Sequence, residues 1–234
     1  MLEARAHGGN AAGGGSRHKV RDGDHHSDVF AASRAVGDLV PVKNAVVSVS
    51  DKTGLAGLSK AFSQFGVNVI ATEGSAEYLR REVEDLKLVG MSEYTEFPEN
   101  LNGRLKTLHP KLQAGVLAIK KFHDSALEKI AASYIDLVVV NLYPFEETVR
   151  KGASFEECIE NIDVGGPALL RAGAKNHPSV CVVSDPQDYV QLIDELNKNN
   201  GSTTRAFRLK CAQKVFELTA KYDSSIASWF GKNA

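Results

Sequence analysis

The sequence predicts a single α/β domain of three layers, in which a mostly parallel β-sheet is covered by helices on both faces. Short apolar runs alternate with amphipathic segments from Val42 onward, which is the pattern of βαβ units. The most apolar run, residues 136–142, is typical of a strand buried on both faces. A long C-terminal packing helix is predicted by apolar residues at three- and four-residue spacing: Phe207, Cys211, Val215, Leu218, Tyr222, Ile226 and Trp229.

The other elements can be assigned in order along the chain. Besides the run at 136–142, strands are expected at residues 45–50, 67–71, 86–89 and 180–183. Helices are expected at residues 55–65, 75–81, 126–133 and from about Pro167 to Lys175. Residues 92–110 are rich in Glu, Pro, Asn and Gly and are expected to form a long loop, followed by a short apolar piece around Leu117.

The composition is that of an ordinary soluble globular protein. The chain has 234 residues, of which 43% are hydrophobic and 24% charged. A formal net charge of −1 gives no bulk attraction to nucleic acid or to anionic membranes, so any anion binding must be local. Cys158, Cys181 and Cys211 are widely spaced and form no CxxC pair, which favours reduced thiols in a cytoplasmic compartment. No apolar run approaches the length needed to cross a bilayer.

Residues 1–42 differ from the rest, and we expect a disordered extension there, with the folded domain at residues 43–234. The segment is rich in glycine and charge and shows no periodic apolar face. Four of the seven histidines fall in it, but without a fold to fix ligand geometry they predict no metal site. Its aspartates argue against a transit peptide, although targeting to an organelle stays open.

Polar segments follow the predicted strands at the points where a parallel sheet binds its ligands. Small hydroxyl residues and glycine at a helix N-terminus, with a lysine or arginine nearby, are typical of a phosphate cradle. One such segment alone could be a helix cap or a solvated loop, but together they predict a pocket for a phosphorylated small molecule. Neither a Walker nor a dinucleotide-binding motif is present. The segments are residues 48–54 (SVSDKTG), 72–75 (TEGS), 102–110 (NGRLKTLHP) and 140–144 (VNLYP).

The stretch from Glu160 to His177 combines a carboxylate, Asp163, with the glycines and proline of a helix start and a lysine, Lys175, near its end. Gly165 and Gly166 are expected to let a ligand approach the backbone closely. Twelve residues of straight helix separate the two charged groups by roughly 18 Å. If both act on one ligand, the lysine must come from a second subunit related by a two-fold axis. The simpler alternative is a capped helix with a solvated lysine at its C-terminal end.

Five motifs in order carry a resemblance to a known enzyme family: SDKTGL at 50–55, FPE at 97–99, GRLKTLHP at 103–110, NLYPF at 141–145, and IDVGG through AKNH at 162–177. They resemble IMP cyclohydrolase, the N-terminal half of a bifunctional purine biosynthesis protein whose other half is AICAR transformylase. The similarity extends from about Asn44 to Phe230 and implies a methylglyoxal-synthase-like fold. The transformylase domain is expected to be absent.

The resemblance implies closure of FAICAR (formamido-imidazole carboxamide ribotide) to IMP with loss of water, the last step of de novo purine biosynthesis. It implies no metal and no cofactor, and a homodimer with the active site at the interface. Lys175 would donate and accept the proton together with Asp163, while Lys106 and Tyr143 would stabilise the tetrahedral oxygen. The residues expected to bind the substrate are Ser50, Asp51, Lys52, Thr72, Glu73, Gly74, Ser75, Arg104, Leu105, Thr107, Val140, Asn141 and Val164.

One departure from the family pattern bears on nucleotide affinity. Glu73 stands where the family has a glycine, and a carboxylate facing a phosphate would repel it unless it points outward. Two alternatives stay open beside the cyclohydrolase. Methylglyoxal synthase shares the fold but lacks the motifs at 104–110 and 161–177, and a non-catalytic nucleotide-binding module would bind IMP without turnover.

Overall fold

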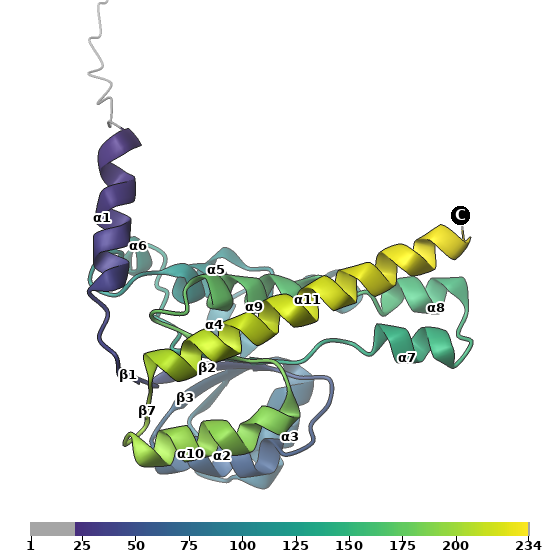
Figure 1. The fold of residues 1–234 in the computed structure, drawn as a ribbon. Helices are drawn as coiled ribbons and strands as arrows, with labels where there is room; N and C mark the ends of the chain where they lie inside the picture. The colour runs from purple at the N-terminus through teal and green to yellow at the C-terminus, as the bar shows by residue number, and fades with distance from the viewer. Residues whose placement is uncertain (1–21, 234) are drawn as a thin grey trace, which may run out of the picture.

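The structure is a computed structural model that describes residues 22–233, and its centre is a five-stranded parallel sheet (Figure 1). The strands are β2 (Asn44–Ser48), β3 (Asn68–Ala71), β4 (Leu88–Gly90), β5 (Leu137–Val140) and β6 (Cys181–Val183). Their spatial order is β4-β3-β2-β5-β6. The chain therefore builds the sheet outward from β2, first to one side and then to the other.

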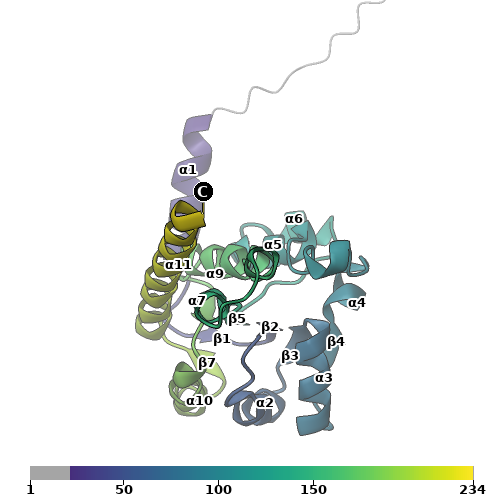
Figure 2. The same cartoon turned by 90° about the vertical axis from the view of Figure 1, so that its right-hand side faces the viewer.

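Helices cover both faces of this sheet, which confirms the predicted three-layer fold (Figure 2). One layer contains α2 (Leu55–Gln64), α3 (Glu73–Glu82) and α10 (Tyr189–Lys198). The opposite layer contains α5 (Pro110–Leu117), α9 (Gly165–Lys175) and the long α11 (Arg205–Asn233). Shorter helices are α4 (Met91–Thr95), α6 (Asp124–Glu128), α7 (Phe145–Arg150) and α8 (Phe155–Glu160). Among the described residues, no helix is both long and apolar enough to cross a membrane.

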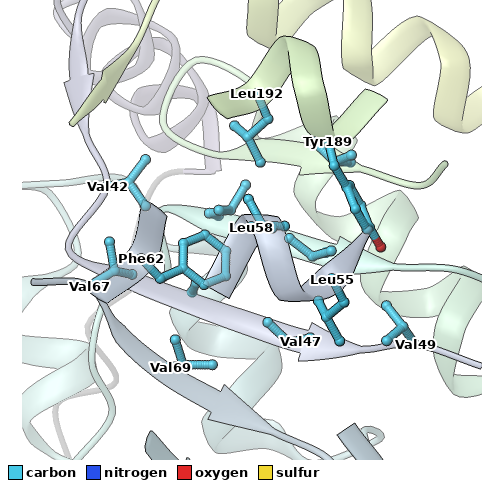
Figure 3. Packing of buried hydrophobic residues seen from close by; sticks show 14 of the residues in the cluster. Val42, Val47, Val49, Leu55, Leu58, Phe62, Val67, Val69, Tyr189 and Leu192 are labelled. Carbon is cyan, nitrogen blue, oxygen red and sulfur yellow. The ribbon is translucent and has the colours of Figure 1, made fainter. Parts of the chain in front are cut away.

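Each face of the sheet has its own core, because successive strand residues point to opposite sides. On one face Val47 and Val69 pack against Leu58 and Phe62 of α2, all fully buried (Figure 3). On the other face, the neighbouring Val46 belongs to a second cluster that includes side chains of α5, α9 and α11. Burial on both faces is why the strands read as continuous apolar runs in the sequence.

A third, smaller cluster lies beyond the sheet, between α7, α8 and the second half of α11 (Figure 1). Its ring pairs include Phe145 against Trp229, with centroids 5.7 Å apart, and Phe155 stacked on Trp229 at 4.9 Å. Sequence periodicity did not predict α7 and α8, because six residues make less than two helical turns. The signal that was present is the capping box of Ser154 and Glu157 at the start of α8.

The predicted boundary of the folded part at residue 42 is wrong, since residues 22–42 contain ordered elements. These are the helix α1 (Asp22–Arg34) and the strand β1 (Val40–Pro41). β1 pairs antiparallel with β7 (Ser202–Thr203), and Val40 and Val42 are buried. The fully buried Arg208 donates to the carbonyls of Gly37 and Asp38, so the segment before β1 is held by the body of the domain. The part of the extension at residues 1–21 lies outside the described residues.

Two further segments differ from the sequence expectation. The end of the expected loop and the piece around Leu117 form α5, which His109 caps by accepting a hydrogen bond from Lys111 N through Nδ1 (3.2 Å). The helix expected at 126–133 is the shorter α6, which ends before Ala131, a residue with φ of 49°. The remaining loop contains α4 and a 3₁₀ turn at Leu101–Gly103.

Candidate functional site

The strand order reverses between β2 and β5, which marks the edge where an open parallel sheet binds its ligands. Ser48 at the end of β2 pairs with Val140 at the end of β5. The chain continues from these two strands into the segments 50–52 and 141–143, so two of the polar segments predicted from the sequence meet at this reversal. The segment at 72–75 follows β3, the other neighbour of β2.

Asn141 joins the two segments at the reversal. Its Oδ1 accepts hydrogen bonds from the backbone N–H groups of Ser50 (2.7 Å) and Asp51 (3.0 Å), and its Nδ2 donates to the carbonyl of Asp51 (2.7 Å). The Asn141 amide therefore fixes the backbone of the loop after β2. The side chains of Ser50 and Asp51 stay exposed beside it.

The start of α3 supplies the second part of the expected phosphate cradle. Ser75 Oγ accepts a hydrogen bond from the backbone N–H of Val49 (3.1 Å), and Thr72 Oγ1 lies 3.3 Å from Ser75 Oγ. Both side chains are buried and brace the loops. An added Cβ at Gly74 would meet nothing within 4 Å, so the backbone there faces open space at a helix N-terminus.

Glu73 turns toward α4. Its Oε1 accepts a hydrogen bond from Ser92 Oγ at 2.7 Å, and its φ lies outside the left-handed region, so the side chain causes no backbone strain. Burial alone would raise the pKa of Glu73, but the hydrogen bonds of Ser92 and the positive charge of Lys106 together lower it. The carboxylate is therefore held by protein groups that stabilise its charge.

Lys106 lies among acidic groups. Its Nζ is 3.0 Å from Glu99 Oε1, and Glu73 and Tyr143 also act on its charge. Burial would lower the pKa of Lys106, but these neighbours raise it, so the side chain stays an ammonium and a hydrogen-bond donor. Gly103, with φ of 87°, makes room for this pair, because a Cβ there would lie 2.6 Å from Lys106 Cε.

Asp163 lies just ahead of α9 and caps it. Its Oδ1 accepts a hydrogen bond from Gly166 N at 2.8 Å. Burial raises the pKa of Asp163, while hydrogen bonds from the backbone of Gly166 and Tyr143 and the charge of Lys106 oppose that rise. The structure thus brings together three of the four expected catalytic residues: Asp163, Lys106 and Tyr143.

The two glycines at the start of α9 make room for the protein's own side chains. A Cβ at Gly165 would collide with Thr107 Oγ1, and one at Gly166 would lie 2.6 Å from Asp163 Oδ2. The sequence predicted that these glycines let a ligand approach the backbone, but the close contacts with Thr107 and Asp163 already explain why neither position has room for a side chain. Pro167 is the third residue of the helix, where its missing N–H still leaves no intrahelical bond unmade.

Lys175 lies at the other end of α9 from Asp163. The helix has 11 residues and is therefore roughly 16 Å long. The Lys175 side chain is exposed. Within one chain the two residues do not meet, as the sequence spacing had predicted.

The remaining expected substrate-binding residues are spread around this edge. Val164 is exposed, Lys52 and Leu105 are half-buried, and Thr107 and Val140 are buried. Arg104 is exposed and forms an ion pair with Glu160 at the end of α8. The two buried residues can therefore offer a ligand little beyond their backbone atoms.

An open groove of about 800 Å³ extends from the reversal toward α7 and α11. Ser50, Asp51, Asn141 and Tyr143 line one end of it. Sequence reasoning missed its other polar lining groups, although Ser184 and Asp185 directly follow β6, the last strand of the parallel sheet, and carried the same signal as the other strand ends. The missed polar residues are Glu146, Glu147, Arg150, Ser184, Asp185, Lys214, Glu217, Lys221 and Tyr222. Over residues 22–233, no three His, Cys, Asp or Glu side chains are grouped so that they could hold a metal ion.

Two family models and several known proteins match this chain. Residues 54–168 match the model of the MGS-like domain, and residues 173–234 match that of the AICARFT/IMPCHase bienzyme. The "Bifunctional purine biosynthesis protein PurH" of Bradyrhizobium diazoefficiens is 49% identical over 193 residues, covering 82% of this chain and 36% of that protein. The protein of the same name from Paracoccus denitrificans is 47% identical over 194 residues, with the same coverage.

A solved structure is also similar. The crystal structure of ForH superposes with a TM-score of 0.69 at 33% identity, covering 80% of this chain and 98% of the ForH chain. By contrast, the chain spans only 36% of the length of the first curated relatives that it matches.

Proposed function

Because the chain belongs to the family of PurH-type purine biosynthesis proteins, we propose that it is an IMP cyclohydrolase, which closes FAICAR to IMP with loss of water. One observation carries this proposal. Asp163, Lys106 and Tyr143 come from segments far apart in the sequence, and they act on one another electrostatically at the reversal of the strand order.

The reaction needs groups that such a cluster supplies. The carboxamide nitrogen attacks the formyl carbon and loses one proton, while the formyl oxygen gains negative charge and takes up a proton to give a tetrahedral carbinolamine. The hydroxyl then takes up a second proton and departs as water, as the former formamide nitrogen loses its proton and forms the ring C=N bond. Lys106 stays protonated, and with the Tyr143 hydroxyl it serves as a donor to that oxygen. Asp163 is a partly buried carboxylate with a raised pKa, which suits a group that holds the carboxamide and shares its proton.

Lys175 completes the acid–base pair from a second copy of the chain. The length of α9 between Lys175 and Asp163 supports a site shared by two chains, in which a two-fold axis would bring the C-terminal end of one α9 to the site of the other. The proposed enzyme is therefore a homodimer with two sites at its interface, acting in the cytoplasm.

The loop 50–52 and the start of α3 would hold the ribotide phosphate. Backbone N–H groups at a helix N-terminus favour an anion, Gly74 leaves space for it, and Lys52 adds positive charge nearby. Glu73 does not block the cradle as long as its carboxylate stays with Ser92. The alternative of a non-catalytic nucleotide-binding module rests on Glu73 alone.

The test is cyclisation of FAICAR to IMP, followed by absorbance, with the chain and its Lys175→Ala variant. Lys198→Ala is the matched control, because Lys198 is also exposed and also in the last turn of a helix. We expect turnover in the chain and the control and a loss of about 10²–10⁴ in Lys175→Ala. Tight IMP binding without turnover in all three proteins would favour the binding module.

A further inference from the structure

We propose that Tyr222 of α11 is a positioning residue for Asp163, a role that rests on the cyclohydrolase function proposed above. The Tyr222 hydroxyl accepts a hydrogen bond from the backbone N–H of Asp163 at 2.8 Å and donates one to the carbonyl of Asn161 at 3.2 Å. One side chain from the C-terminal helix thus holds the backbone on both sides of Ile162, directly before the carboxylate that the reaction needs.

Hydrogen bonds to α8 hold this segment as far as Ile162, whose N–H donates to Ile159 O, and the next N–H, that of Asp163, donates to Tyr222. Residues 161–164 connect α8 to α9 and belong to neither helix. The carboxylate of Asp163 is fixed at its tip by Gly166 N, whereas its backbone N–H is fixed by Tyr222. The bond from Tyr222 of α11 to the backbone therefore acts together with those that the carboxylate accepts from the backbone of Gly166 and Tyr143 to define where this carboxylate lies. An error of about 1 Å in such a position can cost a hundredfold in rate.

The ring of Tyr222 is held independently of its hydroxyl. It is 8% exposed and belongs to the third cluster, where it meets Phe145 edge-on with ring centroids 6.3 Å apart. Removing the hydroxyl leaves these packing contacts in place. A phenylalanine at this position therefore tests the two hydrogen bonds without emptying the cluster.

The hydroxyl keeps its proton across the working pH range. Burial raises the pKa of Tyr222 to about 12, and the charges of Asp163, Asp223 and Tyr143 act in the same direction. A neutral hydroxyl can accept and donate at the same time, which is what the two bonds require. The other groups that act on the Asp163 carboxylate are the charge of Lys106 and the backbone N–H groups of Gly166 and Tyr143, and none of these comes from α11.

The experiment compares Tyr222→Phe with Tyr134→Phe in the full chain. Tyr134 is a fitting control because burial also raises its pKa to about 12 and its hydroxyl is also hydrogen-bonded, but to Ile119 O and Asp124 outside the site. We expect Tyr222→Phe to lower kcat by about 10- to 100-fold with little change in KM, and Tyr134→Phe to leave both near wild type. Equal kcat in the two variants would overturn the proposal.

A double-mutant cycle distinguishes an effect of Tyr222 through Asp163 from a general loss of order in the fold. In an Asp163→Asn background, Tyr222→Phe should cost little further kcat, because the group through which it acts is already gone. A full additional loss in that background would show that Tyr222 does not act through Asp163 and would overturn the proposal.

A readout without turnover keeps this proposal distinct from the proposed function. The carboxyl carbon of Asp163 can be titrated by NMR in the chain and in Tyr222→Phe. If the chain has no cyclohydrolase activity, the proposed function fails, but a shifted Asp163 titration in Tyr222→Phe and not in Tyr134→Phe still supports the positioning. Identical titrations in all three proteins would overturn it.

Discussion

The two ends of α9 are built in opposite ways. At the N-terminal end the side chain of Asp163 is partly buried and bonded to Gly166, and its backbone is held by Tyr222. At the C-terminal end the Lys175 side chain is exposed and forms no hydrogen bond or ion pair with the described residues.

The backbone is nevertheless held by hydrogen bonds at both ends of α9. Directly after Lys175, Asn176 Nδ2 donates to the carbonyls of Val116 (2.8 Å) and Ala118 (3.0 Å). Arg208 then donates to the carbonyls of His177 (2.9 Å) and Pro178 (3.0 Å). A fixed backbone that presents an unpartnered ammonium suits a group that acts on something outside its own chain. The Asp163 end, in contrast, is assembled within one chain.

The largest effect is expected when Asp163 and Lys175 are replaced in separate variants and the two variants are then co-expressed. Asp163→Asn and Lys175→Ala should each lose about 10²–10⁴ of the turnover. When both variants are co-expressed, random pairing gives mixed dimers with one intact site, so about a quarter of wild-type activity should return. Measuring FAICAR turnover of the mixture checks this, and activity no higher than that of the separate variants would mean that both residues serve the same chain.

The backbone after Lys175 should depend strongly on Arg208. Arg208→Met removes a fully buried guanidinium and leaves the carbonyls of Asp38, His177, Pro178 and Thr203 without this donor. Since each buried group left unpaired costs about 1–3 kcal/mol, we expect a loss of about 3–5 kcal/mol in the free energy of unfolding by urea. The half-buried Arg205→Met is the control and should lose clearly less, and similar losses in the two would refute the argument.

At the other end of α9, Asp163→Asn should stabilise the fold. Because burial raises the pKa of Asp163 in the native state, the folded protein holds that proton more tightly than the unfolded chain does. The free energy of unfolding of the wild type therefore falls as the pH rises from 3.8, the pKa of this carboxyl in the unfolded chain, through its higher pKa in the folded protein. Asparagine does not titrate, so the variant does not lose this stability. We expect the variant's Tm to be about 2–4 °C higher at pH 7, with the difference vanishing near pH 3.5.

Thermal melts from pH 3.5 to 7.5 test this prediction. The exposed Asp194→Asn is the control and should show no such pH-dependent gain. A Tm difference for Asp163→Asn that stays constant over that range would contradict the assignment of the effect to burial.

The smallest effect is expected at Glu73, whose negative charge acts on Lys106. Glu73→Gln keeps an oxygen that can accept from Ser92 but removes the charge near the phosphate cradle. One charge at such a partly exposed place is worth about 1 kcal/mol, so the KM for FAICAR should fall about fivefold with kcat little changed. The gain should shrink in high salt, and a KM that rises would show that Glu73 helps binding.

The sequence predicted the regular parts of the molecule because their signals are local. β2 to β6 appear as short apolar runs, and α9 was predicted from about Pro167 to Lys175, close to its observed bounds of Gly165–Lys175, together with the distance between its two charged ends. The motifs also identified Asp163, Lys106 and Tyr143, which the structure brings together. A local signal of this kind needs no knowledge of the partner segments.

Features set by distant contacts could not be predicted. Tyr222 was assigned to the packing face of α11, and nothing in its neighbourhood indicates that its hydroxyl meets residues 161–163, about sixty positions earlier. Gly165 and Gly166 were attributed to a ligand because Thr107 and the Asp163 carboxylate come close only in the folded chain. The order of residues 36–42 likewise depends on Arg208, far along the sequence.

Because α11 is one uninterrupted helix, the number of residues between its two contact points with the rest of the domain is restricted. Arg208, which holds the turn after Lys175, and Tyr222, which holds the backbone of Asp163, lie 14 residues and thus roughly 21 Å apart on one uninterrupted helix. A single residue inserted between them would rotate one anchor by about 100° relative to the other and shift it by about 1.5 Å. Insertions or deletions in that stretch are therefore tolerable only when they restore the helical phase, whereas the surface loops carry no such restriction.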